Sequence, residues 1–377
     1  MGIPVVKFNE KDQPEFFREA KKRVNAYFKE NNISRYANFG MYFKTFFMVA
    51  MYITPLVLML TGVVTSTWAI VGMWAIMGVA VAGIGLGIMH DANHGAYSRS
   101  HKVNRVIGSV LYMCGGYPLN WRIQHNVLHH SFTNIEGLDE DIEKQGIVRF
   151  SPTQERRKFF KFQIIYAPLL YGILTLYWGT VKDYEQVVRY HKRGLLEAQG
   201  VSYGQALFRI IFNKVWYYGV FIALPIIFIP VPWWGSVLGF VLMQFIAGMI
   251  LALIFQAAHV LEETEFFELD ENISVENNWA IHQMKTTSNF ARKGYLFSWY
   301  VGGLNYQVEH HLFPNICHIH YKKLAPIIEA TAKEFNVPYH QHKTFLGALK
   351  SHFKLIHSLG TGSYDERLKE KTTKVAA

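Results

Sequence analysis

Seventeen histidines stand in this 377-residue chain, and eight of them draw attention: seven lie in three short clusters, and one more, His259, ends the second apolar window. The eight are His90, His94, His125, His129, His130, His259, His310 and His311. A spacing of four residues places two imidazoles on the same face of a helix, as at His90 and His94 and again at His125 and His129. His130 is turned by about 100° from His129. The clusters therefore predict faces that offer several imidazoles at once.

A metal centre is the chemistry that such a set of imidazoles favours. Each histidine taken alone is more typical of a hydrogen-bonded surface or core residue than of a ligand. Imidazole suits iron, copper, nickel and zinc, so the ligand type alone leaves the ion open. A structural zinc site needs four ligands and favours cysteine. Eight histidines are too many for one ion, and we predict a dinuclear centre.

Polar neighbours of these histidines are candidates for supporting roles. Asp91, Asn93 and Glu309 could each accept an imidazole N–H and fix the tautomer of a ligand, or serve only as helix caps or exposed residues. A run of acidic residues after the second cluster is interpreted as a solvated turn; it comprises Asp139, Glu140, Asp141 and Glu143. His282, His318 and His320 do not match the ligand spacing, and we expect structural roles for them.

Two windows without charged residues indicate the elements that position the histidines. No Asp, Glu, Lys or Arg stands between Lys44 and Asp91, or between Lys214 and Glu262. Each run of about 46 residues is long enough to cross a hydrocarbon core of about 30 Å twice. Residues 61–67 and 229–235 interrupt the apolar pattern.

The windows predict an all-α integral membrane protein with two transmembrane helical hairpins and a cytosolic helical cap that holds the metal site. The four spans are expected at about 45–65, 68–90, 214–231 and 235–258. Buried helices of a large soluble protein are the alternative, and tandem apolar runs of this length disfavour it.

Two further apolar stretches, 103–119 and 160–181, are expected at the membrane interface. The first is too short to span. A single crossing by the second would separate His259 from the other histidines by the bilayer, so we expect an interfacial or re-entrant element.

Both hairpin tips lack Lys and Arg, whereas the N-terminal segment is rich in them. The positive-inside rule then places both termini and the site on the cytosolic side.

Composition adds limits on class and partners. Half of the residues are apolar and only 18% are charged, and two cysteines exclude a disulfide framework. The net charge of +10 could attract coenzyme A, an acidic electron carrier or anionic lipid heads, and it requires no nucleic acid. We expect a cytosolic N-terminal segment (1–40), a catalytic membrane domain (41–342) and a cytosolic C-terminal tail (343–377).

The order H-x3-H, H-x3-H-H and Q-x2-H-H resembles the three histidine boxes of membrane fatty-acid desaturases. The boxes stand here as His90/His94, His125/His129/His130 and Gln307/His310/His311. The resemblance extends from about Met41 to Tyr339 and includes the phrases at 302–307 and 312–321. Glutamine at the head of the last box is similar to the bacterial acyl-CoA and linoleoyl-CoA branch and its front-end relatives.

This resemblance implies a non-haem di-iron enzyme that uses O₂ to introduce a cis double bond into a fatty acyl chain. It implies the eight histidines as ligands and a separate electron donor, such as a ferredoxin or a b-type cytochrome. Gln307 stands where many relatives have a ninth histidine. Phe255 stands where relatives have an asparagine, with Gln256 beside it, and both glutamines are candidate ligands or supporting residues.

Two other functions compete with desaturation. A hydroxylase, ketolase or alkane mono-oxygenase shares such histidine boxes and differs in its product. A histidine-rich metal transporter would need polar residues along a path between both membrane faces, and the two windows are apolar except at their cytosolic ends.

Overall fold

The computed structural model describes residues 6–142 and 146–376, and almost all of its regular structure is helical. Four helical segments are long and apolar enough to cross a membrane. They are α2 (Phe39–Leu60), the segment Thr67–Asn93, the segment Tyr203–Phe228, and α13 (Trp233–His259). The prediction of a four-span, multi-pass helical membrane protein is confirmed.

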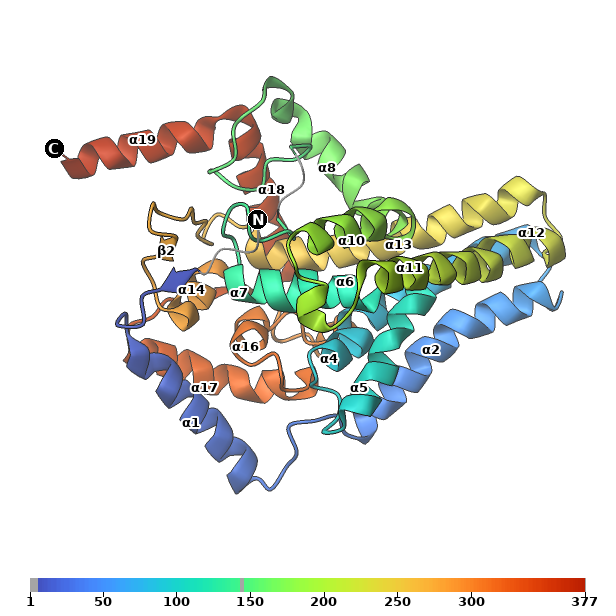
Figure 1. The fold of residues 1–377 in the computed structure, drawn as a ribbon, viewed down its shortest axis with the longest axis horizontal. Coiled ribbons are helices and arrows are strands. Elements are labelled where there is room, and N and C mark those ends of the chain that lie inside the picture. Colours follow the sequence, from blue (N-terminus) through green and yellow to red (C-terminus); the bar gives the residue numbers. More distant parts are fainter. Residues whose placement is uncertain (1–5, 143–145, 377) are drawn as a thin grey trace.

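The second and third spans are not uniform helices. Thr67–Asn93 consists of α3 (Thr67–Gly83), the π-helical turn η1 (Ile84–Ile88) and α4 (Met89–Asn93). Tyr203–Phe228 consists of α11 (Tyr203–Tyr218), η7 (Gly219–Ala223) and α12 (Leu224–Phe228). In Figure 1 the spans run side by side, and the connection between α12 and α13 lies at the end of the bundle farthest from α1 (Pro14–Glu30) and α19 (Ser363–Ala376).

The helices of the first and third candidate spans begin six and eleven residues before the predicted starts of these spans. We predicted that each span begins next to a lysine, but Lys44 and Lys214 lie inside these helices and are buried. Lys44 Nζ lies 3.1 Å from His318 Nε2, and Lys214 Nζ donates to Asp183 Oδ2 at 2.7 Å. A buried lysine with a polar partner is compatible with a span, because its charge is compensated within the protein.

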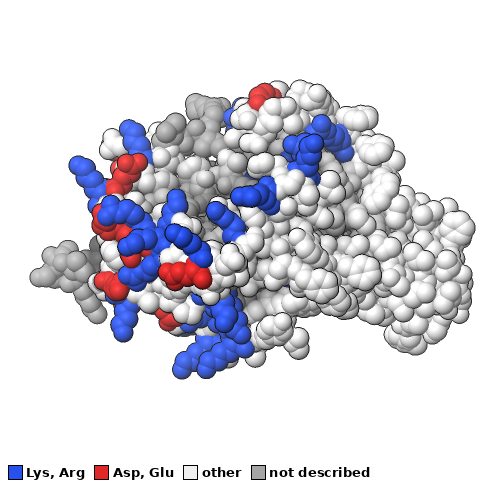
Figure 2. Space-filling model, turned by 90° about the horizontal axis from the view of Figure 1, so that it is seen from below, with Lys and Arg blue, Asp and Glu red and all other residues white. Residues whose placement is uncertain are grey.

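Charged side chains gather at one end of the molecule. Figure 2 shows Lys, Arg, Asp and Glu over one end, whereas the opposite end is free of charge on the face shown. Exposed apolar residues such as Phe46, Trp68, Ile227 and Trp233 lie on the spans, as lipid-facing side chains would. The charged end is built from the helices outside the spans.

Six helices and two small sheets build much of this end. The helices are α1, α14 (Trp279–Thr286), α15 (Tyr295–Tyr300), α16 (Gln307–Leu312), α17 (Tyr321–Glu334) and α18 (Phe345–Thr361). Strand β1 (Lys7–Phe8) pairs in parallel with β2 (Ser274–Val275), and β3 (Ser288–Phe290) with β4 (His340–His342). Helix α1 packs against α17 through Phe16, Ala20 and Val24, which are fully buried.

The two stretches expected at the interface are broken helices. The first contains α5 (His101–Gly108) and the 3₁₀ turn η2 (Ser109–Cys114), and it ends at Gly115, whose φ of 83° favours glycine. The second contains η4 (Lys158–Phe162), α8 (Gln163–Gly172), α9 (Leu174–Tyr177), η5 (Trp178–Lys182) and α10 (Asp183–Lys192). Its two halves meet at a bend of 58°, which fits a broken span or a re-entrant loop.

The first half of the segment predicted as a C-terminal tail forms a packed helix, α18, instead. Helix α18 packs Leu355, Ile356 and Leu359 into a core with α8 and α13. His352 Nε2 lies 2.8 Å from the Tyr171 hydroxyl, which ties α18 to α8. The amphipathic spacing of these apolar residues is a helix signal that the polar composition of the segment obscured.

Candidate metal centre

Four short elements and the end of the long helix α13 bring the eight predicted histidines together. His90 lies in α4 and His94 directly follows it, whereas His259 is the last residue of α13. The second cluster lies on the π-helical segment η3 (Ile123–His129) and the first residue of α7 (His130–Phe132), and the third cluster lies on α16. All eight side chains lie within one connected set of ring contacts.

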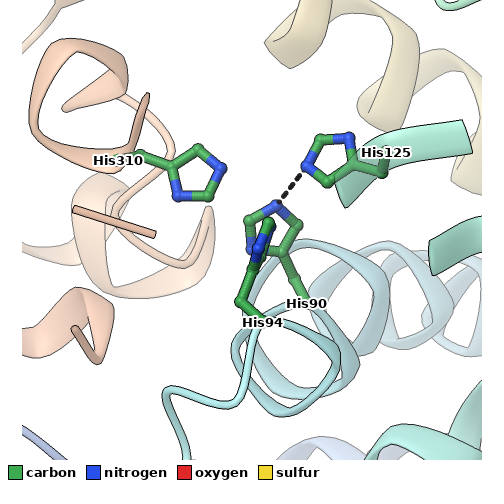
Figure 3. Close-up of side chains that lie close together, drawn as sticks. All are labelled: His90, His94, His125 and His310. Atoms are coloured by element: carbon green, nitrogen blue, oxygen red, sulfur yellow. Dashed lines mark hydrogen bonds between the residues drawn. The ribbon is translucent and has the colours of Figure 1, made fainter. Parts of the chain in front are cut away.

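Four of these histidines form what we call the outer group: His90, His94, His125 and His310. Each can offer one ring nitrogen such that all four nitrogens lie within 4.8 Å of one another. Figure 3 shows the four rings pointing toward a common centre, with the Nε2 atoms of His90 and His125 3.1 Å apart. This is a possible binding site for one metal ion.

Three others form the inner group: His129, His259 and His311. Their ligand nitrogens also lie within 4.8 Å of one another, and all three residues are fully buried. His130 lies between the groups, with its ring centroid 4.6 Å from that of His310 and 4.4 Å from that of His311. The geometry therefore fits two ions with His130 between them.

The π-helical turn in η3 changes one local prediction. On a regular helix His125 and His129 would serve the same site, yet they belong to the outer and the inner group respectively. Their rings nevertheless stack with centroids 5.2 Å apart, and both histidines offer a nitrogen near a carboxylate oxygen of Asp141, so they are neighbours that serve different groups. π-helical turns occur frequently at functional sites.

Unpaired ring nitrogens are the strongest sign that the site binds metal. Among the described residues, buried nitrogens of six histidines have no hydrogen-bond partner: Nε2 of His94, His129, His259 and His311, Nδ1 of His130, and Nδ1 of His282, which belongs to neither group. Leaving a buried polar atom unsatisfied costs roughly 1–3 kcal/mol. The four Nε2 atoms belong to the outer and inner groups, and each is accounted for when it is a metal ligand.

The inner histidines are held in place through their other nitrogen. Asp139 accepts from His129 Nδ1 at 3.0 and 3.1 Å, and the Thr286 carbonyl lies 3.2 Å from His259 Nδ1. Gln283 Oε1 lies 2.7 Å from His311 Nδ1. Such partners fix the tautomer that leaves Nε2 for the metal.

The electrostatic environment favours neutral imidazoles in the outer group. Burial lowers the pKa of His94, His125 and His310, so these rings stay unprotonated, as metal ligands must be. Burial also acts to lower the pKa of His129, but the charge and hydrogen bond of Asp139 outweigh it and raise that pKa. A more basic imidazole is a stronger ligand.

The interpretation of the acidic run as a solvated turn is wrong for three of its members. Asp139 is fully buried, and Asp141 Oδ2 lies 3.5 Å from His125 Nδ1. Glu140 accepts two hydrogen bonds from Arg189, at 2.7 and 2.8 Å. Glu143 lies outside the described residues. Asp139 follows His129 by ten residues, and Asp141 follows His125 by sixteen. A loop can bring residues at these separations together, but no helical spacing predicts the contact.

The acidic and amide residues next to the boxes have other partners than the predicted ones. Asp91 Oδ2 lies 2.8 Å from His318 Nδ1, and Asn93 binds the carbonyl of Met89. Glu309 is fully buried and accepts from Asn289 Nδ2 and from the Tyr339 hydroxyl, each at 2.8 Å. Burial raises the pKa of Glu309 to about 7, and these two hydrogen bonds act against the rise. These residues brace the backbone next to the ligands.

The structure places both candidate glutamines beside the histidines. Gln307 and Gln256 are buried and line the same cavity as His259 and His310. Gln256 Oε1 has no partner among the described residues. Phe255 packs against the inner group, with its ring 5.1 Å from His129 and 4.9 Å from His259.

A cavity of about 390 Å³ opens onto the outer group. His90, His125 and His310 form part of its wall, and Trp121 lies over His125 with the ring centroids 4.6 Å apart. The apolar part of the wall comes from α8, α9, η1 and α13; it includes Leu86, Leu170, Tyr171, Ile173, Leu174, Leu251, Ile254 and Phe255. Volume and lining suit a small molecule with a long apolar part.

Comparisons with known proteins agree with this picture. The sequence model of the fatty acid desaturase family matches residues 66–343. The sn-1 linoleoyl-lipid 6-desaturase of Arthrospira platensis is 34% identical, over 95% of this chain and 96% of its own. The enzyme of the same name from Synechocystis sp. is 35% identical over 95% and 98%, and the acyl-lipid (8-3)-desaturase of Physcomitrium patens is 33% identical over 94% and 74%. These names refer to acyl lipids, so they do not support the acyl-CoA branch suggested by the last box.

Proposed function

Because the chain belongs to the fatty acid desaturase family and is therefore an enzyme that introduces double bonds into acyl chains, we propose that it uses O₂ and two iron ions to do so on lipid-bound acyl chains. The observation that carries this proposal is the pair of histidine groups at the wall of an apolar cavity. Metal ligands and a place for an acyl chain meet there.

The proposed ligands are the eight histidines, with His130 between the two ions. Iron with nitrogen ligands supplies the oxidising power that an unactivated methylene requires, which zinc cannot. Forming the double bond takes two hydrogens from adjacent carbons. With two electrons and two protons supplied from outside, one O₂ is reduced to two water molecules. The electrons come from a separate donor, such as a ferredoxin or a b-type cytochrome.

The side chains around the cavity hold the acyl chain against the outer group. Leu251 and Ile254 on α13 and Leu170 and Leu174 on α8 and α9 belong to the apolar wall. Burial of methylenes contributes roughly 0.8 kcal/mol for each CH₂ group, which would hold the chain in the cavity. Trp121 packs on His125 and adds an apolar surface beside the outer group.

The names of the relatives support a proposal for the carrier and for the position of the new double bond. Proteins named as 6-desaturases of linoleoyl lipids and as (8-3)-desaturases of acyl lipids match this chain over nearly its whole length. We therefore infer a polyunsaturated acyl chain on a membrane lipid as substrate, oxidised on the carboxyl side of an existing double bond.

The proposed orientation places the metal centre and both termini in the cytosol. Helix α16, which carries His310 and His311, belongs to the charged end of the molecule, and the opposite end is free of charge on the face that Figure 2 shows. A soluble electron donor can then reach the centre without crossing the membrane, while the acyl chain stays in contact with the bilayer.

Expression in a heterologous host tests this function. Derivatised total fatty acids from cells with the intact chain and with His310→Ala are compared by gas chromatography and mass spectrometry. We expect a new cis double bond only with the intact chain. Hydroxylated or oxo products would instead support a mono-oxygenase, and the same new double bond with His310→Ala would contradict the ligand assignment.

A further inference from the structure

Helix α17 lies between the outer histidine group and the surface at the charged end of the molecule. Its first residue, Tyr321, is buried, and the Tyr321 hydroxyl lies 3.2 Å from His310 Nδ1. Leu324, Ala325 and Ile328 are buried in a core that α16 shares, whereas the other side of α17 is exposed. A helix with its side chains is about 10–12 Å across. One layer of helix therefore separates His310 from the surface on this side.

The exposed side of α17 carries an excess of positive charge. The two carboxylates of this helix contact arginines, because Glu329 pairs with Arg292 and Glu334 with Arg23. The lysines of the helix are exposed and form no ion pair within the part of the chain that the structure describes. Figure 2 looks at the molecule from the side of α1 and α17 and shows more basic than acidic side chains at this end. Together with the exposed lysine that follows Arg292, we call these lysines the lysine face: Lys293, Lys322, Lys323 and Lys333.

A second exposed segment at the charged end carries the opposite charge. Residues 262–276 follow α13 and contain no Lys or Arg; their acidic members are Glu262, Glu263, Glu265, Glu268, Asp270, Glu271 and Glu276. Lys285 pairs with Glu265 and Glu276, whereas Glu268 and Glu271 are exposed and have no cation beside them among the described residues. An acidic partner is therefore repelled by this segment and attracted by the lysine face.

We propose that the lysine face is the docking surface of the electron donor, and that this donor is a soluble one-electron carrier protein with an acidic face. The inference rests on the proposed function, because that reaction takes two electrons from outside for each double bond. A one-electron carrier is oxidised once at each docking, so two reduced carriers are consumed for each O₂ that is reduced to water. Electron transfer slows steeply with distance, and docking here leaves one helix layer between the carrier and His310.

An acidic protein fits this face better than an anionic membrane surface does. The exposed residues between the lysines are small, Pro326 and Ala330, and α17 exposes no large apolar side chain. A helix that lies on a membrane exposes apolar residues, as α5 does with Val103 and Val106. The neighbouring α15 exposes apolar side chains beside the start of α17, so that end of the helix is the one nearer the bilayer. The rest of the lysine face is open to a protein partner.

A hollow in the surface beside the lysine face leads toward the third histidine cluster. Its walls are formed by Pro326, Glu329, Ala330, Lys333, Val337 and Tyr339. The Tyr339 hydroxyl donates to Glu309 at 2.8 Å, and Glu309 directly precedes His310 in α16. A partner that fills the hollow therefore contacts Tyr339, which is linked to the outer group through Glu309.

Donor kinetics of the purified full chain test the inference. The chain is placed in phosphatidylcholine nanodiscs that contain the acyl substrate identified in the expression host, and product is measured while the concentration of a reduced ferredoxin, or of the reduced soluble domain of a b-type cytochrome, is varied. Lys323→Glu/Lys333→Glu reverses two charges of the lysine face. We expect its KM for the donor to rise at least about tenfold at low ionic strength, because electrostatic steering changes association rates by roughly 10- to 1000-fold.

Salt and a control variant sharpen this measurement. The difference from the wild type should shrink as salt is added, since the screening length falls from about 30 Å at 0.01 M to about 3 Å at 1 M. Lys158→Glu/Lys192→Glu is the matched control, because it reverses two exposed lysines on η4 and α10, which lie apart from α17 in Figure 1. Its KM for the donor is expected to equal that of the wild type.

A single turnover separates docking from catalysis. The chain is reduced with dithionite in the absence of oxygen, excess reductant is removed, and O₂ is added, so that no carrier protein takes part. We expect the same yield of product per chain from the wild type, from Lys323→Glu/Lys333→Glu and from the control.

The outcomes distinguish this inference from the proposed function. An unchanged KM in Lys323→Glu/Lys333→Glu, an equal rise in the control, or a single-turnover yield that falls as far as the steady-state rate would overturn the docking surface. A rise in KM that appears only when phosphatidylglycerol is added to the nanodiscs would assign the lysine face to anionic lipid instead. No product from the wild type in the single turnover would contradict the proposed function, and this inference with it.

Discussion

The outer and inner histidine groups differ in how firmly the protein holds them. Every inner histidine is fully buried, and its Nδ1 has an acceptor in Asp139, Thr286 or Gln283. Three of the four outer histidines line the cavity, against one of the three inner ones, His259, and the Nδ1 partners of His125 and His310 lie at 3.5 and 3.2 Å. We infer that the inner group is the more firmly held of the two and that the outer group is the more open to the cavity.

Loss of the residue between the groups should have the largest effect. His130→Ala removes a ring that contacts both His310 and His311. We expect product formation to fall below detection. Mutation of a residue that only hydrogen-bonds a metal ligand lowers activity by up to roughly 100-fold, and loss of a ligand itself should lower it further. Fatty acid analysis of the expression host measures this. His101→Ala, an exposed histidine outside both groups, serves as control, and full activity of His130→Ala would remove that residue from the centre.

The next largest effect should distinguish the carboxylates of the two groups. Asp139→Asn weakens the acceptor of His129 Nδ1 in the inner group, and we expect iron to be held about 10–100-fold less tightly. Asp141→Asn should cost less, because Asp141 Oδ2 lies 3.5 Å from His125 Nδ1. Competition with a chelator measures both variants. An equal or reversed order would contradict the difference between the groups.

A smaller effect is expected from the hydroxyl that supports the outer group. Tyr321→Phe removes the contact of 3.2 Å between the Tyr321 hydroxyl and His310 Nδ1. One hydrogen bond contributes about 1 kcal/mol, so we expect activity to fall about fivefold with iron retained. Tyr295→Phe, at an exposed tyrosine outside both groups, should change nothing. A loss of iron as large as in Asp139→Asn would show that the outer group is as tightly held as the inner one.

The smallest effect is expected at Gln307. If this side chain contacts substrate without binding iron, Gln307→Asn should lower activity by a few fold, about the size of one hydrogen bond, and leave the iron content unchanged. Elemental analysis of the purified variant measures the iron. Loss of one ion from this variant would make Gln307 a ligand.

The sequence predicted those features that depend on local spacing and hydrophobicity. Apolar windows of sufficient length identified all four spans, and clusters at helical spacing identified the eight histidines that meet in space. The first signal extends over a continuous window and the second over one helical turn, and neither depends on a tertiary contact. The division of His125 and His129 between two groups was missed, because it depends on which histidines of other elements lie next to each ring.

Features that depend on tertiary contacts were not predictable. Asp139 becomes a partner of His129 because the loop after α7 folds back, and Lys44 enters a span because His318 lies beside it. Helix α18 was mistaken for a tail because the polar composition of the segment obscured its apolar spacing, and its core partners lie on α8 and α13. In each case the deciding partner lies elsewhere in the chain or depends on the path of a loop.

The iron content of the purified full chain tests the central claim most directly. We predict two iron ions per chain in the wild type and about one in His259→Ala, because only the inner group loses a ligand. One iron or none in the wild type, or two retained in His259→Ala, would contradict a centre built from these two histidine groups.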